Sequence, residues 1–429
     1  MNSKAGKRLV PKLRFPEFRG DEGWSERSLG EVCNVLQGIG FPDRLQGKLQ
    51  GRYPFCKVSD VSKAVNEVGG VLSAAANYVD DEEILEIRAK LIPIGSTVFA
   101  KIGEALRLNR RAITSAPCLI DNNVTGLKAK TGQATDGFVF YLMQRMDLNE
   151  YCGGVVPSIN KTTLENINIQ VPILQEQGRI ADCLSSIEDL ITAQAQNVEA
   201  LKAHKTGLMQ QLFPAEGETV PRLRFPEFRD SGKWIAITVG QIADFQSGGT
   251  PSKENPVYWN GSIPWVSAKD MKQLFLDDTE DHITTAAIND GAKQARAGAV
   301  LMLTRGMTLL KDIPICILSR QMTFNQDIKA LHAKGDFDGC FLAYLLLSNK
   351  QRLLSMVDIA GHGTGRLDTD KLKTFEVMLP QVAEQRSIAD CFTSLDNLID
   401  VQTQKIDALK VHKIGLMQGL FPSMSEAEA

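Results

Sequence analysis

This 429-residue sequence has no hydrophobic run that could cross a bilayer. Its longest apolar stretch is Phe341–Leu347, whereas a spanning helix needs about 20 residues. No apolar segment follows the basic residues near the start, so we expect no signal peptide. The eight cysteines include no CxxC pair and no Cys–His spacing of a zinc site, which favours reduced thiols. We therefore expect a cytoplasmic protein without a membrane partner.

Motifs of catalysis are also missing. The sequence contains no P-loop, no Gly-x-Ser-x-Gly, no HExxH and no Asn/Asp-Pro-Pro-aromatic tetrapeptide of base-amino methyltransferases. Gly361–Gly365 is rich in glycine but lacks the strand and helix that flank a phosphate-binding loop. The five histidines are scattered, and His204 and His412 occupy repeat-matched positions, which favours structural roles. We expect no catalytic residue, metal site or cofactor in this chain.

The sequence also lacks a strong charge of one sign. With 48 Lys+Arg and 51 Asp+Glu the net charge is −3, which argues against a protein that coats nucleic acid by charge alone. Charged residues make up 23%, apolar residues 43% and aromatic residues 7%, an ordinary globular composition that excludes disorder or a pure coiled coil for the whole chain. The length indicates two to three domains.

What the sequence does contain is a tandem repeat. Pro11–Arg19 (PKLRFPEFR) recurs as Pro221–Arg229 (PRLRFPEFR), a shift of 210 residues, and Trp24 matches Trp234 at the same shift. A second block, 172–214, recurs at 380–422 with a shift of 208 and 24 identical residues among 43. The stretches between these blocks share only scattered positions, among them Asp60 with Asp270 and Gly103 with Gly306.

The repeat predicts two globular heads and two helical arms. We expect head 1 over 1–172, arm 1 over 173–214, head 2 over 215–380, arm 2 over 381–422 and a tail over 423–429. Acidic residues exceed basic ones in the arm segments, by 7 to 3 in 173–220 and by 7 to 4 in 381–429, whereas both heads are nearly neutral. Similar arms with divergent heads suggest one protein whose shared scaffold presents two different recognition domains.

Each arm carries the heptad seam of a coiled coil, with steps that alternate between four and three residues. The seam of arm 1 consists of Ile180, Leu184, Ile187, Ile191, Gln194, Val198, Leu201, Leu208 and Leu212. The seam of arm 2 consists of Ile388, Phe392, Leu395, Ile399, Gln402, Ile406, Leu409, Leu416 and Leu420. Each arm follows a proline and stops at Phe-Pro, and about 38 helical residues span roughly 57 Å.

We expect the two arms to pair with each other in antiparallel directions, as a pseudo-two-fold repeat requires. Packing of each arm on its own head is the alternative. Gln194 and Gln402 would lie near the middle of the seam, where a polar residue can fix register. Lys205 and Lys413 also fall on the seam, and we expect them to snorkel to solvent at its edge.

The heads are predicted to be mixed α/β. Four segments have strand length and strand-like apolar patterns: Gly95–Lys101, Ile167–Val171, Ala299–Leu303 and Phe375–Leu379. Phe138–Arg145 and Phe341–Ser348 each indicate one short buried helix, at matching positions of the two heads. The predicted fold class is therefore α+β: two mixed α/β domains joined by two long antiparallel coiled-coil helices.

Basic residues cluster in loops that also hold glycine and hydroxyl residues. Glycine allows close backbone approach to phosphates, while Arg and Lys reach phosphates and guanine edges. A solvated surface is the alternative for any single one of these residues. The candidate DNA-binding residues are Lys57, Ser59, Lys101, Arg107, Arg110, Arg111, Thr250, Ser252, Lys253, Trp259, Ser267, Lys269, Arg305, Lys311, His362 and Arg366.

These parts together resemble the DNA-specificity subunit of Type I restriction–modification systems. The matching features are Phe-Pro-Glu-Phe and Trp before each head, Gly248–Ser252 (GGTPS) with Tyr258-Trp259, and Ile263–Ser267 (IPWVS) in head 2. On both arms they are Glu-Gln…Ile-Ala-Asp and Gly-Leu-Met-Gln-x-Leu-Phe-Pro. Head 1 departs from the Gly-Gly-Thr-Pro pattern, since it has Gln37–Pro42 (QGIGFP) there.

The resemblance implies that each head is a target-recognition domain for one half of a split DNA sequence. It also implies that the arms form a ruler and a docking site for two modification subunits, which carry adenine methyltransferase activity and bind S-adenosylmethionine, and that restriction/translocase subunits join them. Heads about 34–36 Å apart would read one face of B-DNA, a spacing that the arms can present. We expect an asymmetric, bipartite target and weak binding to double-stranded DNA without the partners.

Two other functions stay open from the sequence. The chain is also compatible with the specificity half of a fused methyltransferase–nuclease system, which uses similar heads. It is compatible as well with a two-headed coiled-coil adaptor that has no DNA role. Steeply salt-dependent duplex binding would separate the DNA-binding functions from the adaptor.

Overall fold

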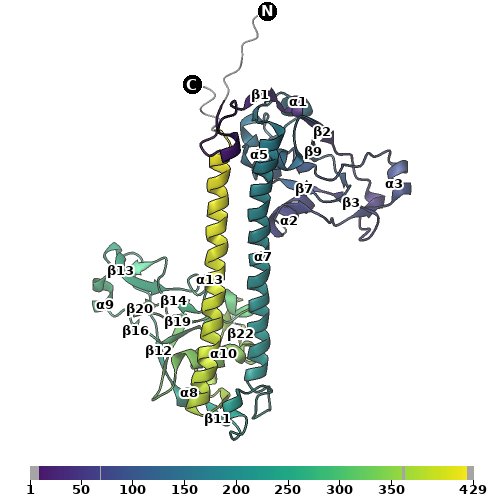
Figure 1. The fold of residues 1–429 in the computed structure, drawn as a ribbon. Helices are drawn as coiled ribbons and strands as arrows, with labels where there is room; N and C mark the ends of the chain where they lie inside the picture. The colour runs from purple at the N-terminus through teal and green to yellow at the C-terminus, as the bar shows by residue number, and fades with distance from the viewer. Residues whose placement is uncertain (1–8, 68, 360–362, 423–429) are drawn as a thin grey trace, which may run out of the picture. The chain divides into compact units, whose positions relative to one another are not determined.

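The computed structural model describes residues 9–67, 69–359 and 363–422. The chain divides into two compact units: unit 1 holds residues 1–196 with 403–429, and unit 2 holds residues 197–402. Each unit therefore contains one head together with the near portions of both arms (Figure 1). Within the described ranges, no helix is both long and apolar enough to span a membrane.

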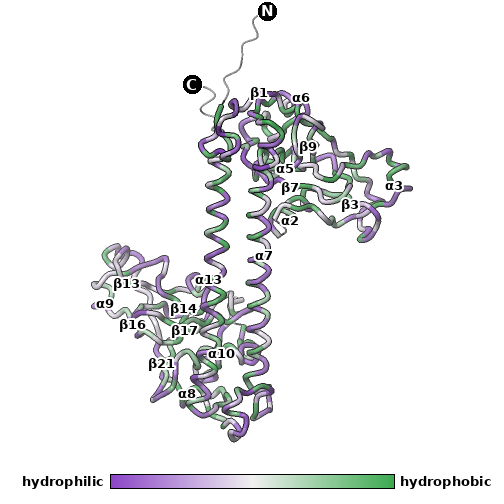
Figure 2. Tube along the Cα trace, viewed as in Figure 1, coloured by the Kyte–Doolittle hydropathy of each residue, from purple (hydrophilic) through white to green (hydrophobic). Residues whose placement is uncertain are grey.

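The two arms are single long helices. Helix α7 spans Leu174–Leu212 and helix α13 spans Val382–Leu420, and each has 39 residues. Each helix begins two residues after a proline, at Pro172 or Pro380, and ends where Phe-Pro follows, as expected because proline cannot continue a helix. Hydrophilic and hydrophobic residues alternate along both helices (Figure 2).

Head 1 contains a five-stranded sheet in the order β2-β9-β6-β7-β4, a three-stranded sheet β5-β3-β8 and the ribbon β1-β10. The strands are β1 (Ser25–Ser28), β2 (Cys33–Gln37), β3 (Tyr53–Cys56), β4 (Val71–Leu72), β5 (Tyr78–Val79), β6 (Thr97–Ala100), β7 (Ala112–Thr114), β8 (Leu119–Ile120), β9 (Val124–Ala129) and β10 (Asn168–Val171). The helices are α1 (Leu29–Val32), α2 (Val58–Glu67), α3 (Asp81–Glu86), α4 (Glu104–Arg107), α5 (Asp136–Arg145) and α6 (Lys161–Glu165).

Head 2 repeats this plan with the order β12-β21-β17-β19-β14, beside the sheets β15-β13-β20-β16 and β18-β23-β22 and the ribbon β11-β24. The strands are β11 (Ile235–Thr238), β12 (Ala243–Ser247), β13 (Trp259–Val266), β14 (Phe275–Leu276), β15 (His282–Ile283), β16 (Gln294–Ala295), β17 (Val300–Leu303), β18 (Arg305–Gly306), β19 (Ile315–Leu318), β20 (Met322–Phe324), β21 (Ile328–Ala333), β22 (Asp358–Ile359), β23 (Gly365–Arg366) and β24 (Glu376–Leu379). The helices are α8 (Val239–Ile242), α9 (Thr285–Asn289), α10 (Gly339–Ser348), α11 (Lys350–Leu354) and α12 (Thr369–Lys373).

The main sheets of the two heads have the same strand order and the same directions. The last pair is parallel in both, β4 with β7 and β14 with β19, and the remaining ladders are antiparallel. One buried helix covers each main sheet, α5 on β6 and β9 in head 1 and α10 on β17, β19 and β21 in head 2. The predicted mixed α/β heads, the four predicted strands and the two predicted buried helices are thus confirmed.

The repeated PxLRFPEFR motif joins each head to its own arm. In unit 1, Arg14 Nε and Nη2 donate to both carboxylate oxygens of Glu176 at the start of α7, at 2.9 and 2.7 Å. In unit 2, Arg224 makes the same two bonds to Glu384 at the start of α13, both at 2.7 Å. All four side chains are buried, at no more than 8% exposure. A paired bidentate geometry is what allows such charges to be buried.

The same motif also holds the end of the other arm. In unit 1 the backbone N–H of Leu13 donates to the carbonyl of Gly419 near the end of α13, and in unit 2 Leu223 donates in the same way to Gln211 of α7. The last carbonyls of a helix have no partner within the helix, so each motif satisfies one of them. In each unit, therefore, the beginning of one arm and the end of the other are attached to one head, which gives the two helix portions antiparallel directions there.

The ends of the arms are part of the hydrophobic cores of the heads. In unit 1, Phe421 stacks on Phe138 and meets Trp24 edge-on, with ring centroids 5.6 and 5.7 Å apart. In unit 2, Phe213 stacks on Phe341 at 5.9 Å and meets Trp234 edge-on at 6.0 Å. The first seam residues Ile180 and Leu184 belong to the unit 1 core and their counterparts belong to the unit 2 core. Each arm thus packs on its own head as well as beside the other arm.

All the predicted seam residues are buried or half-buried, including Gln194, which is 8% exposed. The prediction that Lys205 and Lys413 snorkel to solvent is wrong. Their side chains are 19% and 17% exposed, and each forms an ion pair with a carboxylate of the neighbouring arm helix, Asp396 in unit 2 and Glu188 in unit 1. A cation at a half-buried seam position is stabilised by such a partner, which the heptad pattern does not reveal.

Candidate nucleic-acid interface

In head 2 the segment Gly248–Lys253, called here the glycine loop, directly follows β12. Its first residue lies against the backbone at the end of β20. A Cβ on Gly248 would lie 2.2 Å from the carbonyl oxygen of Asn325, so only glycine fits here. The N–H of Gly249 donates to the carbonyl of Phe324 at 2.8 Å. These contacts fix the start of the loop and leave Thr250, Ser252 and Lys253 exposed beyond it.

Head 1 builds the same loop from a different sequence. A Cβ on Gly38 would lie 1.8 Å from the carbonyl oxygen of Asp121, and the N–H of Ile39 donates to the carbonyl of Ile120 at 3.0 Å. The departure of Gln37–Pro42 from the Gly-Gly-Thr-Pro pattern therefore does not change how the loop is attached. The required glycine is the first one, which both sequences share.

A lysine supports each loop from the neighbouring strands. In head 2, Lys329 Nζ donates to the Ser247 hydroxyl at 2.7 Å, across the β12–β21 ladder that sets these two residues opposite each other. In head 1, Lys101 Nζ donates to Gln37 Oε1 at 2.9 Å. Burial, and secondarily the charge of Lys373, lowers the pKa of Lys329. Sequence reasoning predicted Lys101 but missed Lys329, because the contact depends on a strand pairing with a separation of 82 residues.

Beside this loop lies a groove of about 470 Å³, called here the ribbon groove. It brings together the predicted Arg305 and Arg366 with Lys329 and Gln326. Its lining consists of Thr304, Arg305, Gln326, Asp327, Lys329, Arg366, Leu367, Asp368, Thr369 and Asp370. The predicted Thr250 is attached to it by a short hydrogen bond from its hydroxyl to Gln326 Oε1. The groove offers donors and acceptors of the kinds that contact phosphates and base edges.

Two tryptophans donate hydrogen bonds to backbone carbonyls of the head 2 glycine loop. Trp259 Nε1 donates to the carbonyl of Ser252 and Trp265 Nε1 to that of Gly249, each at 3.0 Å. The two rings meet edge-on with centroids 5.2 Å apart. Trp259, a predicted DNA contact, is half-buried, so in this conformation it supports the loop through its indole N–H.

The other predicted residues of head 2 lie outside the ribbon groove. Ser267 is engaged locally, since its N–H and its hydroxyl both donate to Asp270 Oδ2 at 2.8 Å. Lys269 pairs with Glu280 at 2.8 Å and Asp281 at 3.0 Å, and these hydrogen bonds raise its pKa. Lys311 is exposed after the turn Met307–Leu310. His362 lies outside the described residues.

In head 1 the predicted residues divide into separate places. Lys57 Nζ donates to Gln46 at 2.8 Å and sits over the Phe41 ring of the glycine loop, and Ser59 is exposed next to it. Arg107 is exposed and pairs with Glu104 at 3.3 Å. Arg110 is half-buried and lines a groove beside the arm helices.

Arg111 was predicted to contact DNA, but its side chain is buried. It is 3% exposed, donates to Asn109 Oδ1 at 2.8 Å and stacks over Phe99 with 5.0 Å to the ring centroid. Burial lowers its pKa to about 10. The Arg110-Arg111 pair looks like a surface cluster in the sequence, but the Arg111 guanidinium is covered by Phe99 and donates to the carbonyl of Met146 at 3.4 Å.

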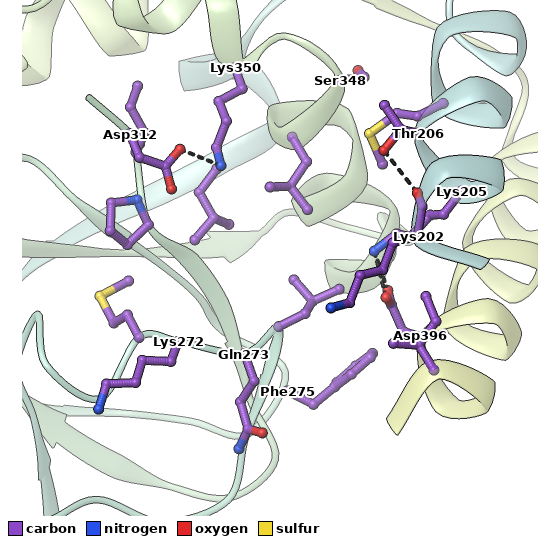
Figure 3. Close-up of a pocket in the computed structure, with 18 of the residues that line it drawn as sticks. Lys202, Lys205, Thr206, Lys272, Gln273, Phe275, Asp312, Ser348, Lys350 and Asp396 are labelled. Carbon is purple, nitrogen blue, oxygen red and sulfur yellow. Dashed lines mark hydrogen bonds and ion pairs between the residues drawn. The ribbon is translucent and has the colours of Figure 1, made fainter. Parts of the chain in front are cut away.

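Each unit also has a groove where the head meets the arm helices. Arm groove 2, of about 650 Å³, lies in unit 2 and is shown in Figure 3. Lys205 Nζ contacts both oxygens of Asp396, at 2.5 and 2.7 Å, and Tyr344 donates to the same carboxylate at 2.7 Å. Arm groove 1, of about 560 Å³, lies in unit 1 and is lined by the ion pair of Lys413 and Glu188, and Tyr141 donates to Glu188 at 2.7 Å.

The arm grooves are equivalent under the repeat. Lys202, Lys205, Met209 and Ile399 of arm groove 2 correspond to Lys410, Lys413, Met417 and Ile191 of arm groove 1. In arm groove 2, Lys350 also pairs with Asp312 at 2.5 Å (Figure 3). In the described ranges no cluster of three or more His, Cys, Asp or Glu residues could hold a metal ion.

The family profile of the Type I restriction modification DNA specificity domain matches the chain twice, over residues 21–203 and 232–411. These two matches cover most of the chain and coincide with the two repeats. The chain belongs to this family of DNA-specificity subunits. The resemblance expected from the motifs is thereby confirmed.

Individual relatives agree with this assignment. The EcoR124I/EcoR124II specificity subunit of Escherichia coli is 31% identical over 169 residues, which are 39% of this chain and 42% of that protein. The MjaVIII specificity subunit of Methanocaldococcus jannaschii is 23% identical over 94% of both chains. The fold is similar to that of the S subunit of a Type I restriction–modification system from M. genitalium, with 14% identity, a TM-score of 0.60 and 97% and 100% of the two chains covered.

Proposed function

We propose that this chain is the non-catalytic DNA-recognition subunit of a Type I restriction–modification complex and that it reads a bipartite, asymmetric target, one half-site per head. The observation that carries the proposal is the paired loop architecture. Both heads attach a glycine loop to the sheet by the same backbone bonds, yet the side chains that border the loops differ. Equal scaffolds with unequal contact residues suit two different half-sites.

The arms are the proposed docking sites for two modification subunits, which would hold S-adenosylmethionine and the adenine methyltransferase activity, and restriction subunits would join the assembly. Two features support two equivalent docking sites. Four arm residues of one groove recur at the matching positions of the other, Lys202, Lys205, Met209 and Ile399 as Lys410, Lys413, Met417 and Ile191. In addition, the repeat-matched leucines Leu190 and Leu398 are 45% and 41% exposed on the arm helices, so the two halves present the same apolar residue at the same position.

The proposal is tested by measuring duplex binding of the full chain in complex with its modification subunits. We expect tight, sequence-dependent binding with a steep dependence on salt, because Lys and Arg release counterions from DNA, and weak binding by the chain alone. A complex that assembles but binds all duplexes equally weakly at every salt concentration would instead support the two-headed adaptor.

The arms are also the proposed ruler of the spacer between the half-sites. Deletion of one heptad from each arm shortens each helix by about 10 Å. We expect an altered spacer length with unchanged half-sites when the methylated DNA is sequenced. Changed half-sites with an unchanged spacer would contradict the ruler.

A further inference from the structure

Two arginines of head 2 are held next to each other on the ribbon β18–β23–β22. Arg305 lies directly opposite Arg366 in the antiparallel pair β18–β23, and Gly306 lies opposite Gly365. Residues directly opposite in such a ladder project from the same face with Cβ atoms about 5 Å apart. Both arginines are exposed and both line the ribbon groove. Like charges in this position repel each other and destabilise the pair.

The protein itself compensates this repulsion only in part. Arg366 has Asp368 at 3.5 Å, but that carboxylate also accepts two backbone N–H groups at the start of α12. Asp358, which lies opposite Arg366 in β22, pairs with Lys371 at 2.7 Å. Arg305 forms no ion pair with any residue of the ranges 9–67, 69–359 and 363–422.

The remaining groove residues add a cation and further carboxylates. Lys329 brings a third positive charge, which is turned toward Ser247. Of the carboxylates, Asp370 pairs with Lys373 at 3.3 Å, and Asp327 also lines the groove. Within the described ranges Arg305 and Lys329 have no carboxylate partner, and Arg366 shares Asp368 with the start of α12, so the charge of the Arg305–Arg366 pair is only partly compensated.

Head 1 has the same ribbon without the charges. Ile102 lies opposite Ser158 in an antiparallel bridge. The backbone bond from Ile159 to Lys101 corresponds to the one from Leu367 to Thr304 in head 2. Ile102 and Ser158 thus occupy the positions of Arg305 and Arg366, and the ribbon of head 1 carries no like-charge pair.

We propose that Arg305 and Arg366 together clamp one phosphate of the DNA backbone beside the half-site read by head 2, a contact that head 1 lacks. The inference rests on the proposed function, because it assumes that head 2 meets DNA. A phosphate is favoured over a base edge for a physical reason. An anion between the two guanidinium groups removes their repulsion and accepts charge-assisted hydrogen bonds from both, whereas a neutral guanine edge leaves the repulsion in place.

The clamp is tested with variants that place the residues of head 1 into head 2. Arg305→Ile and Arg366→Ser, singly and together, are compared with Arg320→Ser, which removes another exposed arginine of head 2, one held by Asp278 at 2.7 Å. Duplex binding is measured for the full chain with its modification subunits over a range of salt concentrations. We expect the log–log slope of the double variant to fall by about 0.9, the value of one phosphate contact.

The loss of affinity should be the same for cognate and non-cognate duplexes, because phosphate contacts carry no sequence information. We expect roughly a tenfold loss at moderate salt, the size of one hydrogen bond to a charged group, and no change for Arg320→Ser. A double variant whose slope equals that of the unchanged chain would overturn the clamp. A loss confined to duplexes with one particular base would overturn it as well, since it would indicate base readout.

A second experiment uses the unchanged protein and altered DNA. Single uncharged methylphosphonates are placed in turn at each phosphate of both half-sites. We expect one position beside the head 2 half-site at which the substitution weakens the unchanged complex about tenfold and leaves the double variant unaffected. Sequence-specific binding without such a position would contradict the clamp alone, whereas absence of specific binding to unmodified duplex would contradict the proposed function too.

Discussion

In head 1, Arg14 and Trp24 both donate to Glu176, whereas in head 2 Arg224 donates to Glu384 and the indole N–H of Trp234 has no partner among the described residues. A second comparison, between the ribbons of the two heads, sets Ile102 and Ser158 against Arg305 and Arg366. The two arginine–glutamate bonds to the arms are thus repeated, the tryptophan bond is not, and these facing residues of the ribbons differ. The arginine–glutamate bonds that attach each head to its arm can therefore be conserved while the exposed residues of that head change.

The largest expected effect is on the buried attachment. Glu176→Ala and Glu384→Ala each leave a buried arginine without its partner, which costs about 3–5 kcal/mol of the free energy of unfolding. Glu176→Ala should cost about 1 kcal/mol more, because Trp24 also loses an acceptor. Urea unfolding of the full chain measures both, with Glu199→Ala as an exposed control. Costs no larger than that of the control would show that the motif does not hold the arms.

The glycine loops provide the next comparison. Gly38→Ala and Gly248→Ala force a Cβ into a backbone carbonyl in both heads, so we expect each to cost about 1–3 kcal/mol through displacement of the loop. Each should also weaken recognition of one half-site only. Gly40→Ala and Gly249→Ala, where a Cβ meets open space, are the matched controls. Differential scanning calorimetry and methylation of each half-site are the measurements, and equal loss at both half-sites would contradict independent heads.

The tryptophans test the asymmetry of the attachment. Trp24→Phe removes a hydrogen bond to a buried carboxylate, 3.3 Å long, whereas Trp234→Phe removes an N–H that has no acceptor in the described chain. Both variants lose similar packing, so the difference between their unfolding free energies isolates the bond. We expect Trp24→Phe to be more destabilising by about 1–2 kcal/mol. Equal values would mean that the two attachments are equivalent.

The smallest effects are expected in the arm grooves. Tyr141→Phe and Tyr344→Phe each remove one hydroxyl bond to a carboxylate, so we expect a loss of about 1 kcal/mol from each. Burial raises the pKa of both tyrosines above 10.0, the unfolded value. The folded state therefore keeps protons that the unfolded state loses, and stability should fall as pH rises past about 10. The phenylalanine variants should show a weaker decline in pH-dependent unfolding, and parallel declines would contradict this assignment.

The repeat made much of the fold predictable. The offsets of 210 and 208 residues located the PxLRFPEFR motif and the arms. Short apolar segments such as Ala299–Leu303 were predicted to be strands, and the structure has strands there. The seam pattern identified residues that are buried or half-buried. The bond between Arg14 and Glu176 was not predictable, because 162 residues separate its partners and nothing in their spacing links them.

The candidate site was predictable only in part, for a similar reason. Arg305 and Arg366 were identified as basic residues near glycines, but that they are opposite neighbours follows from strand pairing across 61 positions of sequence. Lys329 and Gln326 were missed because neither belongs to a glycine-rich or basic cluster. Arg111 was included as a surface cation, but its side chain is buried against Phe99, a contact that residue type and spacing do not reveal.

The central claim is that each head reads its own half of a split target, and sequencing of methylated sites tests it most directly. DNA modified by this chain together with its modification subunits should carry one asymmetric motif, with two different half-sites separated by a spacer of fixed length and free sequence. A single continuous motif, or a palindrome with identical halves, would contradict the account.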